Sequence, residues 1–415
     1  MNQVKFNRSD GLNAAEFHKK SIMLHRIKYI FTTFGYSEIE TPTFESYDVY
    51  QSIIGTVDRD SMVKVIDPSG KILVMRPDVT IPITKMQVSE APITLENQRL
   101  FYTENVFRLS EGELGKKEWT QAGIENFAPS SVETDAEVIA LAVRVLRSMK
   151  LGSIQVQVGL ASFFRTLLEQ VSLTIAERKE LLSLVRAKNI SEMELFLTNR
   201  EVPENLLKLL LEIPYLYGEF NQVVERAKSL PLNDSMKEEI EKLEALHHML
   251  KIYDVESYVS LDLGLINHMD YYSGIIFQGF IENVGKPVLM GGRYDKLAAQ
   301  IGETLPAIGF ACEVDVLLDA IAQKSIFESV APPVDAVVVY EWSRQKEAIQ
   351  TGDKLRKDGL RIIVTAQSES GALPEGTPVI RYAKTDQVIE KDSRMTPFYE
   401  PDNLSEILKR NKEEM

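Results

Sequence analysis

The sequence contains one cysteine, five histidines and no long apolar run. Because Cys312 has no second cysteine to pair with, an intramolecular disulfide and a cysteine-rich zinc site are excluded, as is typical of a reducing compartment. The histidines show no metal-ligand spacing, so we expect no metal and no other cofactor. No run of about eighteen apolar residues occurs, which excludes a membrane-spanning helix. The first residues lack the apolar segment of a signal peptide, and we expect a cytoplasmic protein.

Positive charge is scarce as well. The chain has 47 lysines and arginines against 61 aspartates and glutamates, a net charge of −14. This balance gives no electrostatic footprint for nucleic acid, unless a local basic groove lies within it. The 44% share of hydrophobic residues is ordinary for a soluble globular protein, and 415 residues predict about two or three domains.

The N-terminal part predicts one long helix followed by strands. Gly35 supplies the C-terminal stop of the helix. Its apolar residues recur at helical spacing: Phe17, Leu24, Ile27, Phe31 and Phe34. Residues 38–45 predict an extended strand that is interrupted at Pro42. Because Pro42 cannot donate to a ladder, the strand should lie at an edge or an interface.

Residues 60–127 predict an antiparallel sheet. Its first hairpin joins residues 62–66 to 71–75, and its second joins 100–109 to 119–127 through the polar loop 110–118. The next segment, Thr134 to Glu137, reads as a capping box that opens a helix with a buried apolar face.

Composition divides the remaining chain. Residues 162–250 change to leucine, glutamate and lysine with helical periodicity, which predicts a helical insertion before strands resume at 258–263. A boundary falls around residues 325–333. We therefore expect a core domain, 1–325, and a small α/β domain, 334–415, whose strand–helix–strand order implies parallel strands.

The strand 119–127 is the most informative candidate for a site. Its alternation places Gln121, Gly123 and Glu125 on one face. A glutamine and a carboxylate on either side of a glycine would leave a polar hollow for a small ligand. The pattern alone is equally compatible with a polar face turned to solvent, and that alternative stays open.

Other candidates combine charged, aromatic and glycine residues. Arg108 ends the partner strand, where a guanidinium suits a carboxylate or phosphate. Residues 75–80 follow a strand and present Asp78 and Thr80. Residues 269–274 lie between apolar strands, and Gly291 to Asp295 is expected to open a helix, where backbone N–H groups favour anions.

The order and spacing of these segments resemble the core of class II aminoacyl-tRNA synthetases, specifically histidyl-tRNA synthetase, from about residue 10 to 320. Residues 35–45 resemble the first class II motif, which builds a dimer interface, and residues 107–125 resemble the second. Asp270-Tyr271-Tyr272 and residues 291–295 resemble the two histidine-recognition signatures. The resemblance implies an α+β fold in which helices flank an antiparallel sheet, and a C-terminal domain like a shortened anticodon-binding domain.

The resemblance also implies a histidine pocket of eight residues: Asp78, Thr80, Arg108, Gln121, Glu125, Tyr271, Tyr272 and Tyr294. In it, Asp78 (a glutamate in the synthetases), Thr80 and Gln121 would hold the α-ammonium group, and Arg108 would reach the carboxylate. The other four residues would bound the imidazole.

The residues for amino-acid activation are missing. The two arginines that these synthetases direct at ATP are replaced by Asn267 and Val316, and Glu313 replaces a glycine beside the nucleotide. Residues 109–113 are acidic where the synthetases carry a basic stretch. Because loss of one preorganised donor costs about 10²–10³ in rate, little activation would remain, and we expect no catalytic residues.

A histidyl-type core without activation chemistry resembles the regulatory subunits of ATP phosphoribosyltransferase. In that family the subunit pairs with a short catalytic subunit, usually in a hetero-octamer, for the first step of histidine biosynthesis. The resemblance implies that the catalytic subunit requires this subunit for its activity and that histidine, as effector, inhibits the complex. It also implies a core homodimer through residues 36–45. Binding of tRNA is not expected.

Two alternatives remain open. One is a histidine–tRNA ligase with divergent motifs, which histidine-dependent ATP–pyrophosphate exchange would reveal. The other is a synthetase paralogue that senses tRNA or an amino acid, which calls for a basic groove or a fused effector domain.

Overall fold

The computed structural model describes residues 11–53, 57–90, 98–109, 116–200, 202–266, 271–324, 334–369, 377–391, 394–398 and 404–413. The chain divides into two compact units, residues 1–326 and 327–415, each of which is described by itself. Asn267, Asp270 and most of the acidic loop after Leu109 lie outside the described residues.

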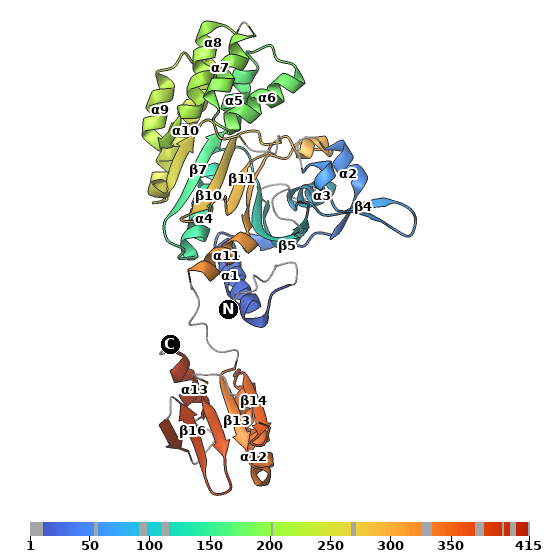
Figure 1. Ribbon diagram of the computed structural model, residues 1–415, viewed down its shortest axis with the longest axis vertical. Coiled ribbons are helices and arrows are strands. Elements are labelled where there is room, and N and C mark those ends of the chain that lie inside the picture. The colour runs from blue at the N-terminus through green and yellow to red at the C-terminus, as the bar shows by residue number, and fades with distance from the viewer. Residues whose placement is uncertain are drawn as a thin grey trace. The chain divides into compact units, whose positions relative to one another are not determined.

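A nine-stranded sheet forms the centre of the first unit (Figure 1). Neighbouring strands are antiparallel except for two parallel pairs, β1 with β5 and β7 with β9. In sheet order the strands are β1 (Ser37–Glu38), β5 (Gln98–Phe107), β6 (Glu118–Phe127), β12 (Ala307–Glu313), β11 (Leu289–Arg293), β10 (Ile275–Ile281), β7 (Ile154–Leu160), β9 (Val259–Asp262) and β8 (Tyr217–Glu219). The predicted antiparallel sheet is confirmed, and β5 and β6 form the predicted second hairpin.

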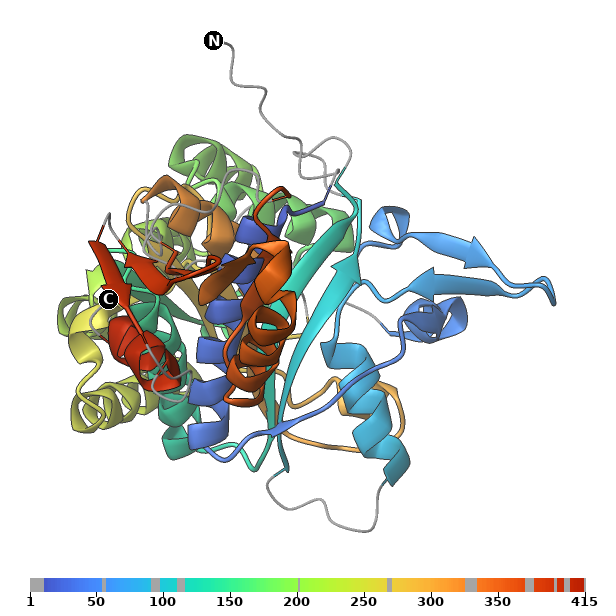
Figure 2. The ribbon, with the colours of Figure 1, turned by 90° about the horizontal axis from the view of Figure 1, so that it is seen from below.

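A separate three-stranded sheet holds the first predicted hairpin. Its strands are β2 (Phe44–Ser46), β4 (Ile72–Met75) and β3 (Lys64–Ile66), and the β3–β4 hairpin projects from the body of the first unit (Figure 2). The predicted interruption at Pro42 is confirmed, because β1 and β2 lie on either side of it, and each is an edge strand of its own sheet, as predicted. One prediction was wrong: the two predicted hairpins do not share one sheet.

Three helices pack on one face of the large sheet: α1 (Ala14–Thr33), α4 (Val132–Ser148) and α11 (Val314–Gln323). Helix α1 presents Phe31, whose ring lies 5.6 Å from that of Phe101 and 5.9 Å from that of Phe310. Phe17, predicted on the same apolar face, is 61% exposed, near the N-terminal end of the helix. Residues of the central strands β5, β6, β11 and β12 line a pocket.

The start of α4 corrects the predicted capping box. Its N-cap is Ser131, whose hydroxyl accepts a hydrogen bond from the Thr134 backbone N–H at 3.2 Å. The helix thus begins three residues earlier than predicted. Thr134 occupies the third helical position, which leaves Asp135 in the first turn.

The predicted helical insertion is present next to β7 and β9. It contains α5 (Ala161–Leu168), α6 (Ile175–Arg186), α7 (Ile190–Thr198), α8 (Glu204–Glu212), α9 (Phe220–Lys228) and α10 (Asp234–Ile252). It also contributes β8, which the sequence did not indicate, as an edge strand of the large sheet. The first unit is completed by α2 (Tyr47–Ser52) and α3 (Thr80–Glu90), and short 3-10 turns lie at Arg59–Ser61, Ile213–Tyr215, Glu256–Tyr258 and Ala298–Gln300.

In its described residues, the second unit is a five-stranded sheet with two α-helices. Its strand order is β14 (Ile362–Ala366), β13 (Ala336–Tyr340), β15 (Val379–Tyr382), β16 (Gln387–Lys391) and β17 (Arg394–Pro397). Helix α12 (Gln345–Lys357) follows a 3-10 turn at Trp342–Arg344, and α13 (Leu404–Glu413) ends the described chain. The predicted strand–helix–strand unit with parallel strands corresponds to β13, α12 and β14. Within the described residues, no helix is both long and apolar enough to cross a membrane.

Candidate functional site

The floor of the site is a shallow trough where glycines replace side chains on β6 and β12. The register places Gly309 opposite Glu125 and Ala311 opposite Gly123. A methyl group on Gly123 would lie 2.5 Å from the Tyr102 hydroxyl, and one on Gly309 would lie 2.0 Å from Glu125 Oε2. Since real side chains never approach so closely, both glycines are needed for the neighbouring side chains to lie across the sheet.

A pocket opens over this trough, and all eight predicted site residues line it. Its volume is about 60 Å³, so in this state it suits a small ligand. Sequence reasoning missed Tyr102, Met290 and Phe310 as lining residues. Register explains Tyr102: it lies opposite Gly123 on β5, a relation that a confident hairpin alignment could have revealed.

Glu125 is the most buried carboxylate of the pocket, at 2% exposure. It accepts hydrogen bonds from the Thr80 hydroxyl at 2.6 Å and from the Tyr294 hydroxyl. Burial raises the pKa of Glu125 to about 7, although both hydroxyls favour the ionised form. The group can therefore receive a proton, or face a cation, near neutral pH.

Asp78 precedes α3 and carries an unsatisfied acceptor. Its Oδ1 accepts from the Ile81 backbone N–H at 2.8 Å, as a residue at a helix start does. Its Oδ2 is buried and has no hydrogen-bond partner. Burial raises the pKa of Asp78 to about 6. A cationic ligand group at Oδ2 would therefore offset the cost of burying an ionised carboxylate without a partner.

Three tyrosines form the aromatic wall. The rings of Tyr271 and Tyr272 lie 4.7 Å apart at 39°, and Tyr294 meets Tyr271 edge-on at 5.8 Å and 82°. Burial raises the pKa of each phenol above its usual value. The wall therefore offers neutral hydroxyls and ring faces, surroundings that suit a small aromatic or heterocyclic group.

Gln121 and Arg108 supply the donors of the pocket, and both contact Glu313. The Gln121 amide donates to Glu313 Oε1 at 2.8 Å, and an Arg108 guanidinium nitrogen lies 3.7 Å from the same oxygen. The register explains the first contact, because Glu313 lies opposite Gln121 on β12. The carboxylate that the sequence placed near a nucleotide therefore lies inside the predicted amino-acid pocket.

The segment from Gly291 to Asp295 was predicted wrongly as the opening of a helix. Gly291 and Gly292 lie within β11, where a methyl group on Gly292 would lie 2.8 Å from the Tyr272 ring. The glycine pair therefore serves close packing between strands and aromatic rings, and no helix N-terminus is available there for an anion.

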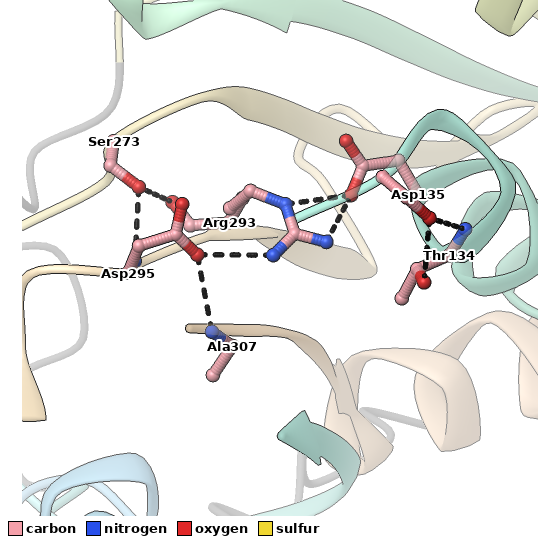
Figure 3. A network of polar contacts seen from close by, with 7 residues as sticks. Thr134, Asp135, Ser273, Arg293, Asp295 and Ala307 are labelled. Carbon is pink, nitrogen blue, oxygen red and sulfur yellow. Dashed lines mark hydrogen bonds and ion pairs between the residues drawn. The ribbon is translucent and has the colours of Figure 1, made fainter. Parts of the chain in front are cut away.

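Arg293 does not line the pocket and instead lies in an ion-pair network with Asp135 and Asp295 (Figure 3). Its Nη2 lies 2.6 Å from Asp135 Oδ1, and its Nη1 lies 3.0 Å from Asp295 Oδ1. Asp295 also accepts from the Ala307 backbone N–H at 3.2 Å. The network joins α4 to β11 and the start of β12, and so fixes the backbone that carries Tyr294.

The position compared with a synthetase arginine, Val316, is packed in the interior. It belongs to α11 and is 6% exposed. One residue before it, Asp315 accepts from the Thr120 backbone N–H at 3.0 Å and pairs with Lys116 at 3.1 Å. Within the parts that the structure describes, no three metal-ligating side chains gather as a metal site requires.

The chain is similar to known proteins over most of its length. A model of the histidyl-tRNA synthetase family matches residues 10–317. The ATP phosphoribosyltransferase regulatory subunit of Oceanobacillus iheyensis is 38% identical over 95% of this chain and 96% of its own length. The chain belongs to the family of ATP phosphoribosyltransferase regulatory subunits. Its relative from Acetivibrio thermocellus, of the same name, is 35% identical over 84% of this chain and 83% of its own length.

Solved structures agree with the family and the fold. A crystal structure described as an ATP phosphoribosyltransferase regulatory subunit/histidyl-tRNA synthetase from Bacillus halodurans has a TM-score of 0.78 at 26% identity, covering 90% of this chain and 95% of that one. Histidyl-tRNA synthetase from Nostoc has a TM-score of 0.75 at 17% identity, covering 95% and 96%, which shows the shared fold alone.

Proposed function

We propose that this chain is a non-catalytic, histidine-sensing subunit of a cytoplasmic ATP phosphoribosyltransferase. In this role it activates a short catalytic subunit in the first step of histidine biosynthesis and confers feedback inhibition by histidine. The names of its relatives support the regulatory role. The pocket supports the effector, because all eight expected residues converge on it.

The unpartnered Oδ2 of Asp78 is the observation that carries the choice of ligand. A buried acceptor without a donor favours a cationic group, and an α-ammonium group would supply both charge and N–H donors. Thr80 and Gln121 complete the polar surroundings. Glu125, with its pKa near 7, would receive an imidazole N–H among the three tyrosines.

The absence of activation chemistry is part of the proposal. Val316 is packed in the interior and Asn267 has no positive charge, so neither supplies a cation to a nucleotide. Arg108 faces Glu313, a carboxylate of opposite charge. These features support a pocket that takes an amino acid without ATP.

The assembly is proposed from the same resemblance. A core homodimer would form through residues 36–45, where Phe44 is 51% exposed and the Thr41 backbone N–H donates to Glu104. Pairing with the short catalytic subunit would give a hetero-octamer, without tRNA. The domain at 334–415 is proposed as a shortened relative of the anticodon-binding domain.

Reconstitution tests the proposal. The chain is mixed with a short-form catalytic subunit from the same organism, and phosphoribosyl-ATP formation is followed with and without histidine. We expect activity only in the mixture, inhibition by histidine, and weaker inhibition with Glu125→Gln.

No stimulation of a folded catalytic partner would overturn the regulatory role. Histidine-dependent ATP–pyrophosphate exchange by the chain alone would instead favour the histidine–tRNA ligase alternative. Salt-sensitive tRNA binding in a filter assay would favour a tRNA-sensing paralogue.

A further inference from the structure

Glu313 places a carboxylate where the donors of the pocket converge. It ends β12 opposite Gln121, accepts from the Gln121 amide at 2.8 Å, and lies 3.7 Å from Arg108. Its side chain is 13% exposed and that of Arg108 is 23% exposed, so the pairing is largely shielded from water. The groups best suited to bind a ligand carboxylate are thus already engaged by a carboxylate of the protein.

Glu313 lies directly before α11, where its side chain could cap that helix. Glu313 is the N-cap of α11, yet its side chain makes no capping hydrogen bond. Glu219 occupies the same position before α9 and does cap it, accepting from the backbone N–H groups of Asn221 at 3.1 Å and Gln222 at 2.9 Å. A glutamate can therefore cap a helix in this chain, and the Glu313 carboxylate is held in the pocket instead.

The pocket carries more acidic than basic side chains, which affects how a ligand carboxylate can bind. Among its described lining residues, Asp78, Glu125 and Glu313 are acidic, and Arg108 is the one strong cation. A ligand carboxylate would add a further negative charge against a single guanidinium. Two carboxylates cannot share Gln121 and Arg108 without repulsion, so a ligand carboxylate must displace Glu313 to reach them.

We propose that Glu313 is an internal substitute for a ligand carboxylate and sets the affinity of the pocket for α-amino acids. This inference rests on the proposed function, since it assumes that histidine enters this pocket. The ligand carboxylate takes the Arg108 guanidinium and the Gln121 amide N–H from Glu313, while the Gln121 amide oxygen remains able to accept from the α-ammonium group. The released Glu313 side chain moves to the N-terminus of α11, where backbone N–H groups and the helix dipole favour an anion. Ligand binding thereby changes the cap of a helix that leads to the end of the first unit.

Two ligands that differ only at the carboxylate test the inference. Calorimetry on the whole chain compares histidine with histidinol, in which a hydroxymethyl group replaces the carboxylate, for the wild type and for Glu313→Gln. We expect Glu313→Gln to bind histidine about tenfold more tightly, because the competing charge is gone. Histidinol affinity should change by less than about twofold.

Asp315→Asn is the matched control. It removes an acidic charge two residues further along, where the side chain contacts Lys116 and Thr120 outside the pocket. Unchanged histidine affinity in this variant, beside a gain in Glu313→Gln, would support displacement of Glu313.

The other outcomes distinguish failure of the histidine site from failure of the role of Glu313. A wild-type chain that binds neither ligand would overturn the proposed histidine site itself. Wild-type binding of histidine with no gain in Glu313→Gln would overturn the role of Glu313 and leave the site intact. An equal gain for both ligands, or an equal gain in Asp315→Asn, would also overturn it, because the effect would then not depend on the ligand carboxylate.

Discussion

Glu125 joins the chemistry of the pocket to the stability of the protein. Burial raises its pKa to about 7 from an ordinary value of 4.5, so the folded chain holds this proton more tightly than the unfolded chain. Between pH 4.5 and 7 the folded state carries the proton and the unfolded state has lost it. The contribution of Glu125 to the free energy of unfolding therefore falls as pH rises, by on the order of 3 kcal/mol in all.

This fall in stability with rising pH can be tested by removing the titrating group. Glu125→Gln should flatten the fall in unfolding free energy between pH 4.5 and 7, because the titrating group is gone. Urea denaturation across this pH range measures it, with Glu133→Gln as control, since Glu133 is exposed on α4. Parallel profiles for the wild type and Glu125→Gln would contradict the raised pKa.

A second residue-scale prediction concerns the glycine floor. Gly309→Ala should destabilise the chain by about 1–3 kcal/mol and weaken histidine binding, because its methyl group would meet Glu125 Oε2. That carboxylate cannot easily move aside, since the Thr80 hydroxyl donates to its Oε1 and the Tyr294 hydroxyl to its Oε2. Thermal unfolding and calorimetry provide the measurements. Gly285→Ala, which meets nothing within 4 Å, should be nearly neutral. Equal effects of the two variants would show that the floor tolerates side chains.

Sequence reasoning reached the members of the pocket but not their pairing. The eight residues came from the resemblance to histidyl-tRNA synthetases, which carries the identity and order of residues along the chain but not their contacts. The contact of Glu313 with Gln121 depends on the register of β12 against β6, strands far apart in sequence. The alternation of β6 likewise could not show whether its polar face is buried or turned to solvent, because nothing within a strand specifies which elements cover it.

At the scale of elements, the Arg293 network ties α4 to β11. Arg293 is 2% exposed, so loss of its main partner leaves a buried guanidinium poorly compensated. We predict that Asp135→Asn lowers the free energy of unfolding by about 3 kcal/mol, part of the charge still being met by Asp295. Chemical denaturation measures this loss, and Glu133→Gln in the same turn should change it by less than about 0.5 kcal/mol. An unchanged midpoint would mean that Asp295 alone is sufficient.

Local signals predicted whole elements better than their ends. Alternation and turn residues located both hairpins, and helical periodicity located α1 and the insertion. Ser131 and Thr134 are both good N-cap residues, so chemistry alone did not choose between them. A glycine pair looks alike before a helix and in a closely packed strand, and the three residues of β8 are too few to show alternation.

At the scale of the molecule, the two units have separate apolar cores. The core of the second unit lies within residues 336–408, and the residues that line the pocket all belong to the first. We predict that a chain ending at residue 326 binds histidine within about twofold of the full chain. Calorimetry tests this, with circular dichroism as the control for folding. A folded fragment that no longer binds would show that the pocket depends on the second unit.

The burial of Cys312 has a practical consequence. The only thiol of the chain lies in β12, fully covered, and burial raises its pKa, so at neutral pH it is an unreactive thiol. A cysteine introduced on the surface would therefore be the sole site for a maleimide dye or spin label, with the native sequence otherwise intact. Site-specific labelling therefore does not require removal of the native cysteine.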